Sequence, residues 1–255
     1  YRRSRRSEFA IWWREIDRVL LLIVLTLMAI GTVAVMAASP ASARRLSTTA
    51  TRLDDLYFLM AHIRWQLVGL VVMLGASTLS KDWARRLGIV LGSAMLVGLF
   101  LVLIPHVGVE VKGARRWLNL GVSLQPSEFL KPAFAIALAW IFSWRARDPN
   151  LPVTQISVAL MGLVAMLLMA QPDFGSTVLF AGVWFVLVLL SGISVKRIGM
   201  IAAAALGALV IVYLTYDNGR NRIDAFLGGG TAFDQVDLAQ RTLLAGGWTG
   251  TGLRL

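Results

Sequence analysis

The sequence has 255 residues, of which 57% are hydrophobic and 15% charged, and it contains no cysteine. Long apolar runs in such a composition indicate a polytopic membrane protein, and the lack of cysteine excludes disulfide bonds and thiol chemistry. The formal charge of +11 could suggest nucleic acid, but membrane proteins accumulate Lys and Arg for topology and headgroup contact, so no nucleic-acid partner is expected.

The first apolar run, from Val19 to Ala38, follows a basic cluster of the kind that also precedes signal peptides. A run of about 20 residues is long enough to cross a hydrocarbon core of roughly 30 Å. We therefore interpret it as a first membrane-spanning helix with a cytoplasmic flank. The chain begins with Tyr1 and ends at Leu255 soon after a Gly-rich stretch, which indicates a segment of a longer polytopic protein.

Seven apolar segments predict an all-α helical bundle that forms one truncated transmembrane domain over residues 1–255. The fourth and sixth segments are the shortest. The expected helices cover residues 19–38, 58–78, 87–105, 128–143, 153–170, 175–191 and 198–215. Residues 216–255 are expected to form a periplasmic loop region with a short helix from Val236 to Ala245.

The distribution of Lys and Arg predicts a cytoplasmic N-terminus. With that orientation the inner segments carry 13 Lys and Arg residues, and the outer segments up to the seventh helix carry six. The outer side then holds Lys112, Arg115 and Arg116, against the positive-inside trend. A requirement other than topology therefore has to keep these cations there.

The outer basic cluster belongs to a polar segment, residues 111–131, that lipid cannot accommodate because unpaired polar groups are costly there. Two interpretations remain open for Lys112, Arg115 and Arg116. They are solvated loop charges, or they form an anion site in which the guanidinium pair chelates phosphate. Trp117 would serve as an amphipathic anchor at the membrane interface.

The motif Gln125-Pro-Ser-Glu-Phe-Leu-Lys131 opens the fourth helix. We expect Ser127 to be its N-cap and Glu128 to lie in the first turn, where the helix dipole favours a carboxylate. Glu128 and Lys131 are three residues apart and can pair on one helix face. The motif is either a helix start with an internal ion pair or, since intramembrane charges usually face a cavity, part of a functional site.

The motif Gln171-Pro-Asp-Phe-Gly-Ser-Thr177 separates two apolar helices without any Lys or Arg. Pro172 and Gly175 predict a tight turn or a broken helix, and Asp173 is expected to cap the helix that follows. One interpretation is a capped turn. The other is that Gln171 and Asp173 face the same cavity as the outer cations.

The acidic residues near the C-terminal end are candidate bases. Asp224, Asp234 and Asp237 lie in a stretch that continues to Gly246-Gly-Trp-Thr-Gly-Thr-Gly252. These glycines do not match a dinucleotide or phosphate-binding fingerprint, which needs a soluble strand–helix unit. With two isolated histidines and no cysteine, a zinc site is not expected.

Together these motifs resemble the SEDS family (shape, elongation, division and sporulation), which includes FtsW, RodA and SpoVE. The segments that carry the resemblance are, in order, KGARRWLNLG, SLQPSEFLK, QPDFGSTVLF, NRIDAFL and AGGWTGTG. The Gln-Val-Asp and GGWTGTG endings are closer to the FtsW type than to the RodA type. The family has ten spanning helices, so the resemblance implies that the last three are missing here.

The resemblance implies a peptidoglycan glycosyltransferase that polymerises lipid II into β-1,4 glycan strands at the outer face of the bacterial inner membrane, at the division septum. Lipid II, membrane lipids, a class B penicillin-binding protein and other division proteins are the implied partners. The outer cations would bind the pyrophosphate, and a divalent cation, Mg or Mn, is a candidate to share its charge. The candidate substrate-binding residues are Lys112, Arg115, Arg116, Trp117, Gln125, Ser127, Glu128, Lys131, Gln171 and Asp173.

The acceptor sugar hydroxyl needs one positioned carboxylate as a base. In the family, the proposed catalytic Asp lies in the outer loop after the seventh helix, in a stretch with an Asp-Pro pair. Residues 227–234 of this chain read LGGGTAFD and lack that pair. We expect Asp234 to be the base, with Asp237 and Asp224 as substitutes; the other interpretation is that Asp234 merely caps the short helix after it.

Two other functions fit the same sequence. A lipid II transporter would also have a central cavity with charged residues at helix ends. A non-catalytic division scaffold would dock a transpeptidase through its helices, and small residues such as those in Ala202-Ala-Ala-Ala-Leu-Gly207 would let those helices pack closely.

Overall fold

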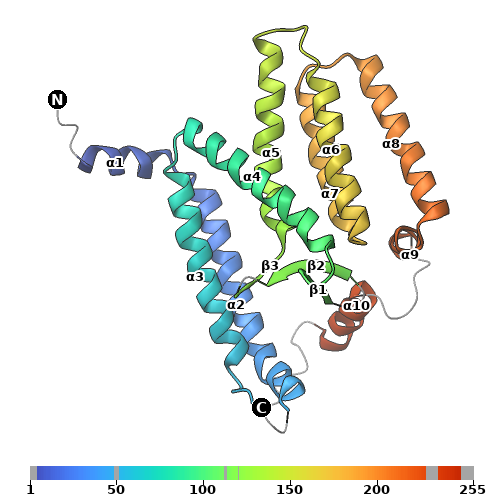
Figure 1. Cartoon of the computed structure of the whole chain (residues 1–255). Helices are drawn as coiled ribbons and strands as arrows, with labels where there is room; N and C mark the ends of the chain where they lie inside the picture. The colour runs from blue at the N-terminus through green and yellow to red at the C-terminus, as the bar shows by residue number, and fades with distance from the viewer. Residues whose placement is uncertain (1–4, 49–51, 112–113, 120, 228–234, 248–255) are drawn as a thin grey trace. The chain divides into compact units, whose positions relative to one another are not determined.

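The computed structural model describes residues 5–48, 52–111, 114–119, 121–227 and 235–247. The chain divides into two compact units, one of residues 1–80 and 242–255 and one of residues 81–241. Helices make up most of the described chain (Figure 1), so the expected all-α class is confirmed.

The first unit contains α1 (Arg5–Glu15), α2 (Arg18–Leu46) and α3 (Tyr57–Ser77). Gln66 joins α3 to α2, because its side-chain oxygen accepts from the Thr32 hydroxyl at 2.9 Å and its amide donates to the Met28 carbonyl at 3.0 Å. Lipid offers polar groups no hydrogen-bond partners, so they must find partners within the protein, as these do. α2 continues eight residues past the expected end at Ala38. The Ser39 hydroxyl in this extension donates to a carbonyl of the loop that follows, at 2.7 Å.

The second unit contains α4 (Lys81–Leu103), β1 (Gly108–Val111), β2 (Ala114–Asn119), β3 (Ser123–Leu124), α5 (Pro126–Ser143), α6 (Val153–Ala170), α7 (Phe174–Leu190), α8 (Val195–Thr215) and α9 (Asp217–Phe226). A short 3-10 turn, Trp144–Ala146, follows α5, and α10 covers Gln235–Gly246.

A helix thus lies at each of the seven apolar segments. α4 begins six residues earlier than expected because its charged first turn continues the helix and pairs Asp82 with Arg85 at 3.0 Å. Residues 216–255, expected as a loop with one short helix, contain both α9 and α10.

A three-stranded antiparallel sheet, in the order β1-β2-β3, lies between α4 and α5 in the chain. No strand is expected there from the sequence, because Arg115 and Arg116 are followed directly by Trp117 and Leu118 in β2, and a half-buried strand alternates apolar and polar side chains. Gly108 begins β1 directly beside the last turns of α4. A Cβ at this position would overlap the Val102 carbonyl oxygen, so only glycine allows the approach.

α4 and α5 pack closely because small residues of α4 face α5. A Cβ on Gly88 would lie 2.8 Å from the Ile136 side chain. One turn later, a Cβ on Gly92 would lie 3.4 Å from Ala133. Small residues four positions apart let two helices approach within a membrane, where van der Waals contact drives association.

The core of the second unit lies between α5, α6 and α7, which run side by side (Figure 1). Phe134 of α5 and Phe180 of α7 meet edge to face with their ring centroids 5.1 Å apart. Five described helices are long and apolar enough to cross a membrane: α2, α3, α4, α6 and α8; α7 is a shorter apolar helix. Their outward side chains are large and apolar, as a surface in contact with lipid requires.

We expect Gly88→Ala to destabilise the protein, although alanine favours a helix over glycine by about 1 kcal/mol. The added methyl group would overlap Ile136, and overpacking costs about 1–3 kcal/mol. The midpoint of thermal unfolding in detergent should therefore fall. The matched control is Gly162→Ala in α6, where a new methyl group meets no other side chain within 4 Å. The control should keep or raise the midpoint, and equal effects of the two substitutions would contradict glycine-dependent packing.

Candidate functional site

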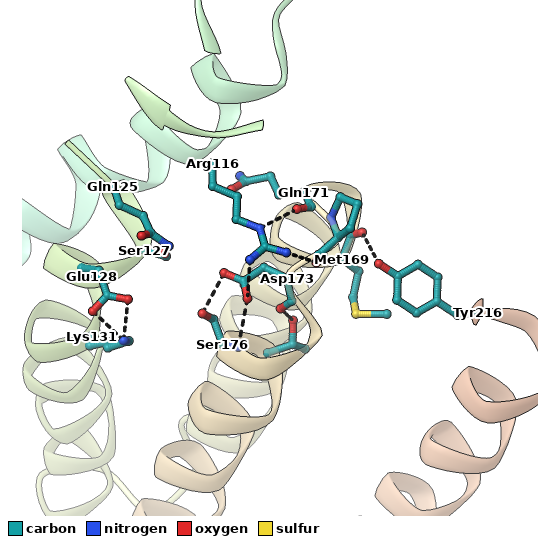
Figure 2. Close-up of polar contacts among 12 residues, drawn as sticks. Arg116, Gln125, Ser127, Glu128, Lys131, Met169, Gln171, Asp173, Ser176 and Tyr216 are labelled. Atoms are coloured by element: carbon teal, nitrogen blue, oxygen red, sulfur yellow. Dashed lines mark hydrogen bonds and ion pairs between the residues drawn. The ribbon is translucent and has the colours of Figure 1, made fainter. Parts of the chain in front are cut away.

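Arg116 of β2 holds its strand against the turn between α6 and α7 (Figure 2). Its Nε donates to the Gln171 carbonyl at 3.2 Å, and its Nη2 donates to the Pro172 carbonyl. Its Nη1 lies 3.8 Å from a carboxylate oxygen of Asp173. All three guanidinium nitrogens therefore have partners within the protein, and only 24% of the side chain is exposed.

Gln171 and Asp173 are buried in that turn. Gln171 Nε2 donates to the Leu99 carbonyl at 2.9 Å and so links the turn to α4. Asp173 caps α7, because its carboxylate accepts from the Ser176 N–H at 3.3 Å and from the Ser176 hydroxyl at 2.8 Å. The expected cap is confirmed. Both candidate side chains are engaged in internal hydrogen bonds.

A second guanidinium group, on α9, reaches the start of α7. A Cβ on Gly175 would lie 2.9 Å from Arg222 Nη1, so Arg222 lies over the first turn of α7. Nearby, the Tyr216 hydroxyl donates to the Met169 carbonyl at 3.5 Å (Figure 2). Arg222 was not a candidate from the sequence. The one signal that could have found it is its place in the segment NRIDAFL.

Arg115 has other partners than its neighbour Arg116. The pairing of β1 and β2 shifts register between Val109 and Glu110, so Arg115 lies opposite Glu110 while Arg116 has no partner residue on β1. Arg115 Nε donates to Glu110 at 3.1 Å, and the two side chains are 40% and 53% exposed. Trp117 is partly buried and pairs in register with Val109 of β1. The described contacts therefore do not unite the two arginines into one chelating pair, and they leave Arg115 as the accessible cation of β2.

The start of α5 differs from the sequence expectation in one respect. Gln125 is its N-cap and Pro126 its first residue, so the prediction that Ser127 is the N-cap was wrong. Proline suits this position because its missing N–H has no helical partner there anyway. Ser127 is buried and accepts from the Gln125 amide at 3.1 Å. The expected pair forms: Lys131 Nζ donates to both Glu128 oxygens at 2.7 Å, and the side chains are 30% and 52% exposed (Figure 2).

None of the candidate bases Asp224, Asp234 and Asp237 takes part in the contacts described above. Asp234 and the candidate cation Lys112 fall outside the described residues, and Asp237 lies in α10 without a described side chain. Asp224 of α9 lies within hydrogen-bonding reach of the Tyr213 hydroxyl of α8. In the described part of the chain no three His, Asp or Glu side chains converge as metal ligands, so no residue is assigned to a divalent cation.

Comparison with known proteins identifies relatives along nearly the whole chain. Residues 17–255 match the model of the cell cycle protein family FtsW/RodA/SpoVE. The chain is 31% identical over 256 residues to the probable peptidoglycan glycosyltransferase FtsW of Caulobacter vibrioides, covering 99% of this chain and 64% of the relative. It is 36% identical over 214 residues to the protein of the same name from Alkalilimnicola ehrlichii, covering 80% and 51%. The chain therefore spans less than two thirds of the curated relatives' length.

Solved structures agree with the family match. One is a chain of "Structural coordination of polymerization and crosslinking by a peptidoglycan synthase complex", with a TM-score of 0.68, 26% identity and coverage of 92% of this chain and 66% of that one. The rod shape determining protein RodA of Thermus thermophilus gives a TM-score of 0.57, 29% identity and coverage of 76% and 60%. With five apolar helices of sufficient length, these likenesses identify a multi-pass membrane protein.

We expect Arg116→Ala to loosen the turn between α6 and α7, because two carbonyls lose their donor and buried Asp173 loses its cation. Hydrogen bonds to a charged group contribute about 1.5–3 kcal/mol, so the thermal midpoint should fall. Amide hydrogen exchange in peptides covering residues 170–177 should accelerate. The matched control is Arg115→Ala, which removes an exposed pair worth about 0–1 kcal/mol. Equal exchange in the two variants would contradict the clamp.

Proposed function

The chain belongs to the FtsW/RodA/SpoVE family of cell cycle proteins, and from this membership we propose that it forms part of a peptidoglycan glycosyltransferase of cell division. Its substrate would be lipid II, as both donor and acceptor. The glycan would be made at the outer face of the bacterial inner membrane. The names of the curated relatives support the reaction class, and the charged groups of the second unit support the chemistry.

The observation that carries the proposal is a group of charged side chains beside the sheet, where α5 and α7 begin. α5 and α7 both begin beside the sheet, and Arg116 is tied to the turn before α7 (Figure 2). Arg115, Glu128 and Lys131 remain partly exposed there. The distribution of Lys and Arg predicts that this end is the outer one, where cations oppose the positive-inside trend, so accessible charges here favour a site for a charged substrate.

Donor binding follows from the charges of lipid II, which carries a pyrophosphate between its lipid tail and its disaccharide. Arg115 and Lys112 would neutralise the pyrophosphate, and the N-terminus of α5, which has no side-chain cap, adds its positive dipole end. Arg116 would act differently, by fixing the strand that carries Arg115. It is a positioning residue rather than a ligand for the phosphate.

The proposed step is a direct displacement. The acceptor hydroxyl oxygen attacks the anomeric carbon of the donor, the bond to pyrophosphate breaks, and the pyrophosphate leaves with the electron pair. The hydroxyl proton passes to a carboxylate, for which Asp234 is our first candidate. Attack from the opposite face inverts the centre, so an α-linked donor gives a β-linked glycan. Neutralisation of the leaving group makes acid catalysis unnecessary.

A penicillin-binding protein of class B is the proposed partner, and the division septum the proposed location. The similar peptidoglycan synthase complex couples polymerization and crosslinking, which supports such a partnership here. Crosslinking consumes the strands that polymerisation supplies, so joining the two activities keeps the product at hand. The assays below therefore use the full-length chain together with its transpeptidase.

Asp234→Ala should lower the rate of glycan formation from lipid II by about 10²–10⁴-fold, the usual contribution of a positioned base. The measurement is glycan chain formation by the purified complex. Asp217→Ala is the matched control, because this exposed acid has no assigned role and its variant should keep activity. If Asp234→Ala stays active and Asp237→Asn or Asp224→Asn loses activity, the role of base belongs to that other residue. If the wild-type protein moves lipid II across the membrane of liposomes without making glycan, the protein is a transporter and the enzyme proposal fails.

Arg115→Ala should lower kcat/KM for lipid II at least tenfold, because a hydrogen bond to a charged group contributes about 1.5–3 kcal/mol. Its thermal midpoint should hardly change, since the pair with Glu110 is exposed. Arg147→Ala removes the same charge after α5 and should leave both quantities unaltered. A normal kcat/KM in Arg115→Ala would exclude this residue from donor binding.

A further inference from the structure

Two cavities share a wall at the end of the second unit that is remote from the sheet. There α5 ends, α6 begins and α8 begins (Figure 1). The first is a small polar cavity of about 170 Å³ whose wall includes Arg145, Asn150 and Arg197. The second is a larger groove of about 810 Å³ between α6, α7 and α8. Thr154, Gln155 and Arg197 line both.

The polar cavity has cationic groups without an internal anion. Arg145 Nη1 is buried and has no hydrogen-bond partner among the described residues. No ion pair in the described part of the chain involves Arg145 or Arg197. α6 begins at Val153 on the same wall, so its first N–H groups add positive potential. The cavity therefore suits an anion with several acceptor oxygens, such as a phosphate group.

The groove suits a hydrocarbon chain. Val158 of α6, Ile201 and Ala204 of α8 and the Trp184 ring line it, and its volume falls in the range of about 300–1,000 Å³ usual for ligand sites. From Arg197 to Ala204 it follows α8 for roughly 10 Å. Trp184 is 9% exposed, and its buried Nε1 has no acceptor among the residues that the structure describes. An ester carbonyl at the top of an acyl chain would supply one.

We propose that the two cavities bind one anionic phospholipid. Its phosphate lies between Arg145 and Arg197, and one acyl chain lies along the groove between α6 and α8. The distribution of Lys and Arg assigns this end of the helices to the cytoplasmic leaflet, where anionic lipids attract basic residues. The site is separate from the charged end at the sheet and does not depend on the proposed transferase activity.

The test measures lipid binding to the full-length, delipidated protein in neutral detergent by native mass spectrometry, with the thermal midpoint as a second readout. The probes are phosphatidylglycerol, phosphatidylcholine and inorganic phosphate. Wild type should bind phosphatidylglycerol at least fivefold more tightly than phosphatidylcholine, and only phosphatidylglycerol should raise the midpoint markedly. Each basic residue near an anionic lipid raises the affinity about fivefold. The double variant Arg145→Ala with Arg197→Ala should therefore bind phosphatidylglycerol at least tenfold more weakly.

The matched control is Arg147→Ala with Lys196→Ala. It removes two exposed charges that lie within two residues of Arg145 and Arg197 in the sequence but do not line the polar cavity. It should keep the preference for phosphatidylglycerol. Ala204→Trp on the lipid-exposed helix α8 fills the groove and keeps both arginines. It should weaken binding of both lipids, and it tests the proposal even if the double arginine variant fails to fold.

Four results would overturn the proposal. Equal losses in the control pair and the cavity pair would mean diffuse surface attraction. Stabilisation by inorganic phosphate equal to that by phosphatidylglycerol would mean a free-phosphate site. Equal affinity for phosphatidylglycerol and phosphatidylcholine would show that the arginines do not select an anionic lipid. Unchanged binding in Ala204→Trp would show that the acyl chain does not lie in the groove.

Discussion

The Arg116 guanidinium joins parts of the second unit that lie more than fifty residues apart in the chain. The turn between α6 and α7 exposes carbonyl groups that helices cannot satisfy, and lipid offers them no donor. Arg116 donates to two of them, and Gln171 carries the network on to Leu99 of α4. Asp173 is buried beside this cation, and its carboxylate accepts two hydrogen bonds from Ser176 at the start of α7. The sheet, α4 and α7 thereby become one polar network at the end of an apolar bundle.

This network decides which cation of β2 would be available to the proposed substrate. The register shift between β1 and β2 leaves Arg116 without a partner residue on β1. Arg116 binds the α6–α7 turn, while Arg115 pairs with Glu110 of β1. Both side chains of this pair are partly exposed, so a more strongly charged group can displace Glu110 at small cost. A rigid strand presenting one loosely paired arginine is a better holder for a pyrophosphate than two mobile arginines, because less side-chain entropy is lost on binding.

Sequence reasoning succeeded where the determinant was local. The α6 segment was expected at 153–170 and the helix has those bounds; the Asp173 cap and the Glu128–Lys131 pair also follow from spacing along one helix. It failed where partners are distant. The sheet depends on strand pairing across Gly108–Leu124, and Arg222 meets α7 only through tertiary packing. The Ser127 cap was missed by two residues because the proline before it takes the first helical position.

An arginine lies at each end of the second unit, but the two have opposite surroundings. At the sheet, the chain supplies carbonyls and a carboxylate for Arg116, so its donors are satisfied before any ligand arrives. At the other end, a buried guanidinium nitrogen of Arg145 has no described partner. An unmet buried donor costs about 1–3 kcal/mol, which a bound anion would recover. Since the loop after α5 supplies no such acceptor among the described residues and the apolar groove opens beside the arginines, the missing partner is best sought in the surrounding lipid.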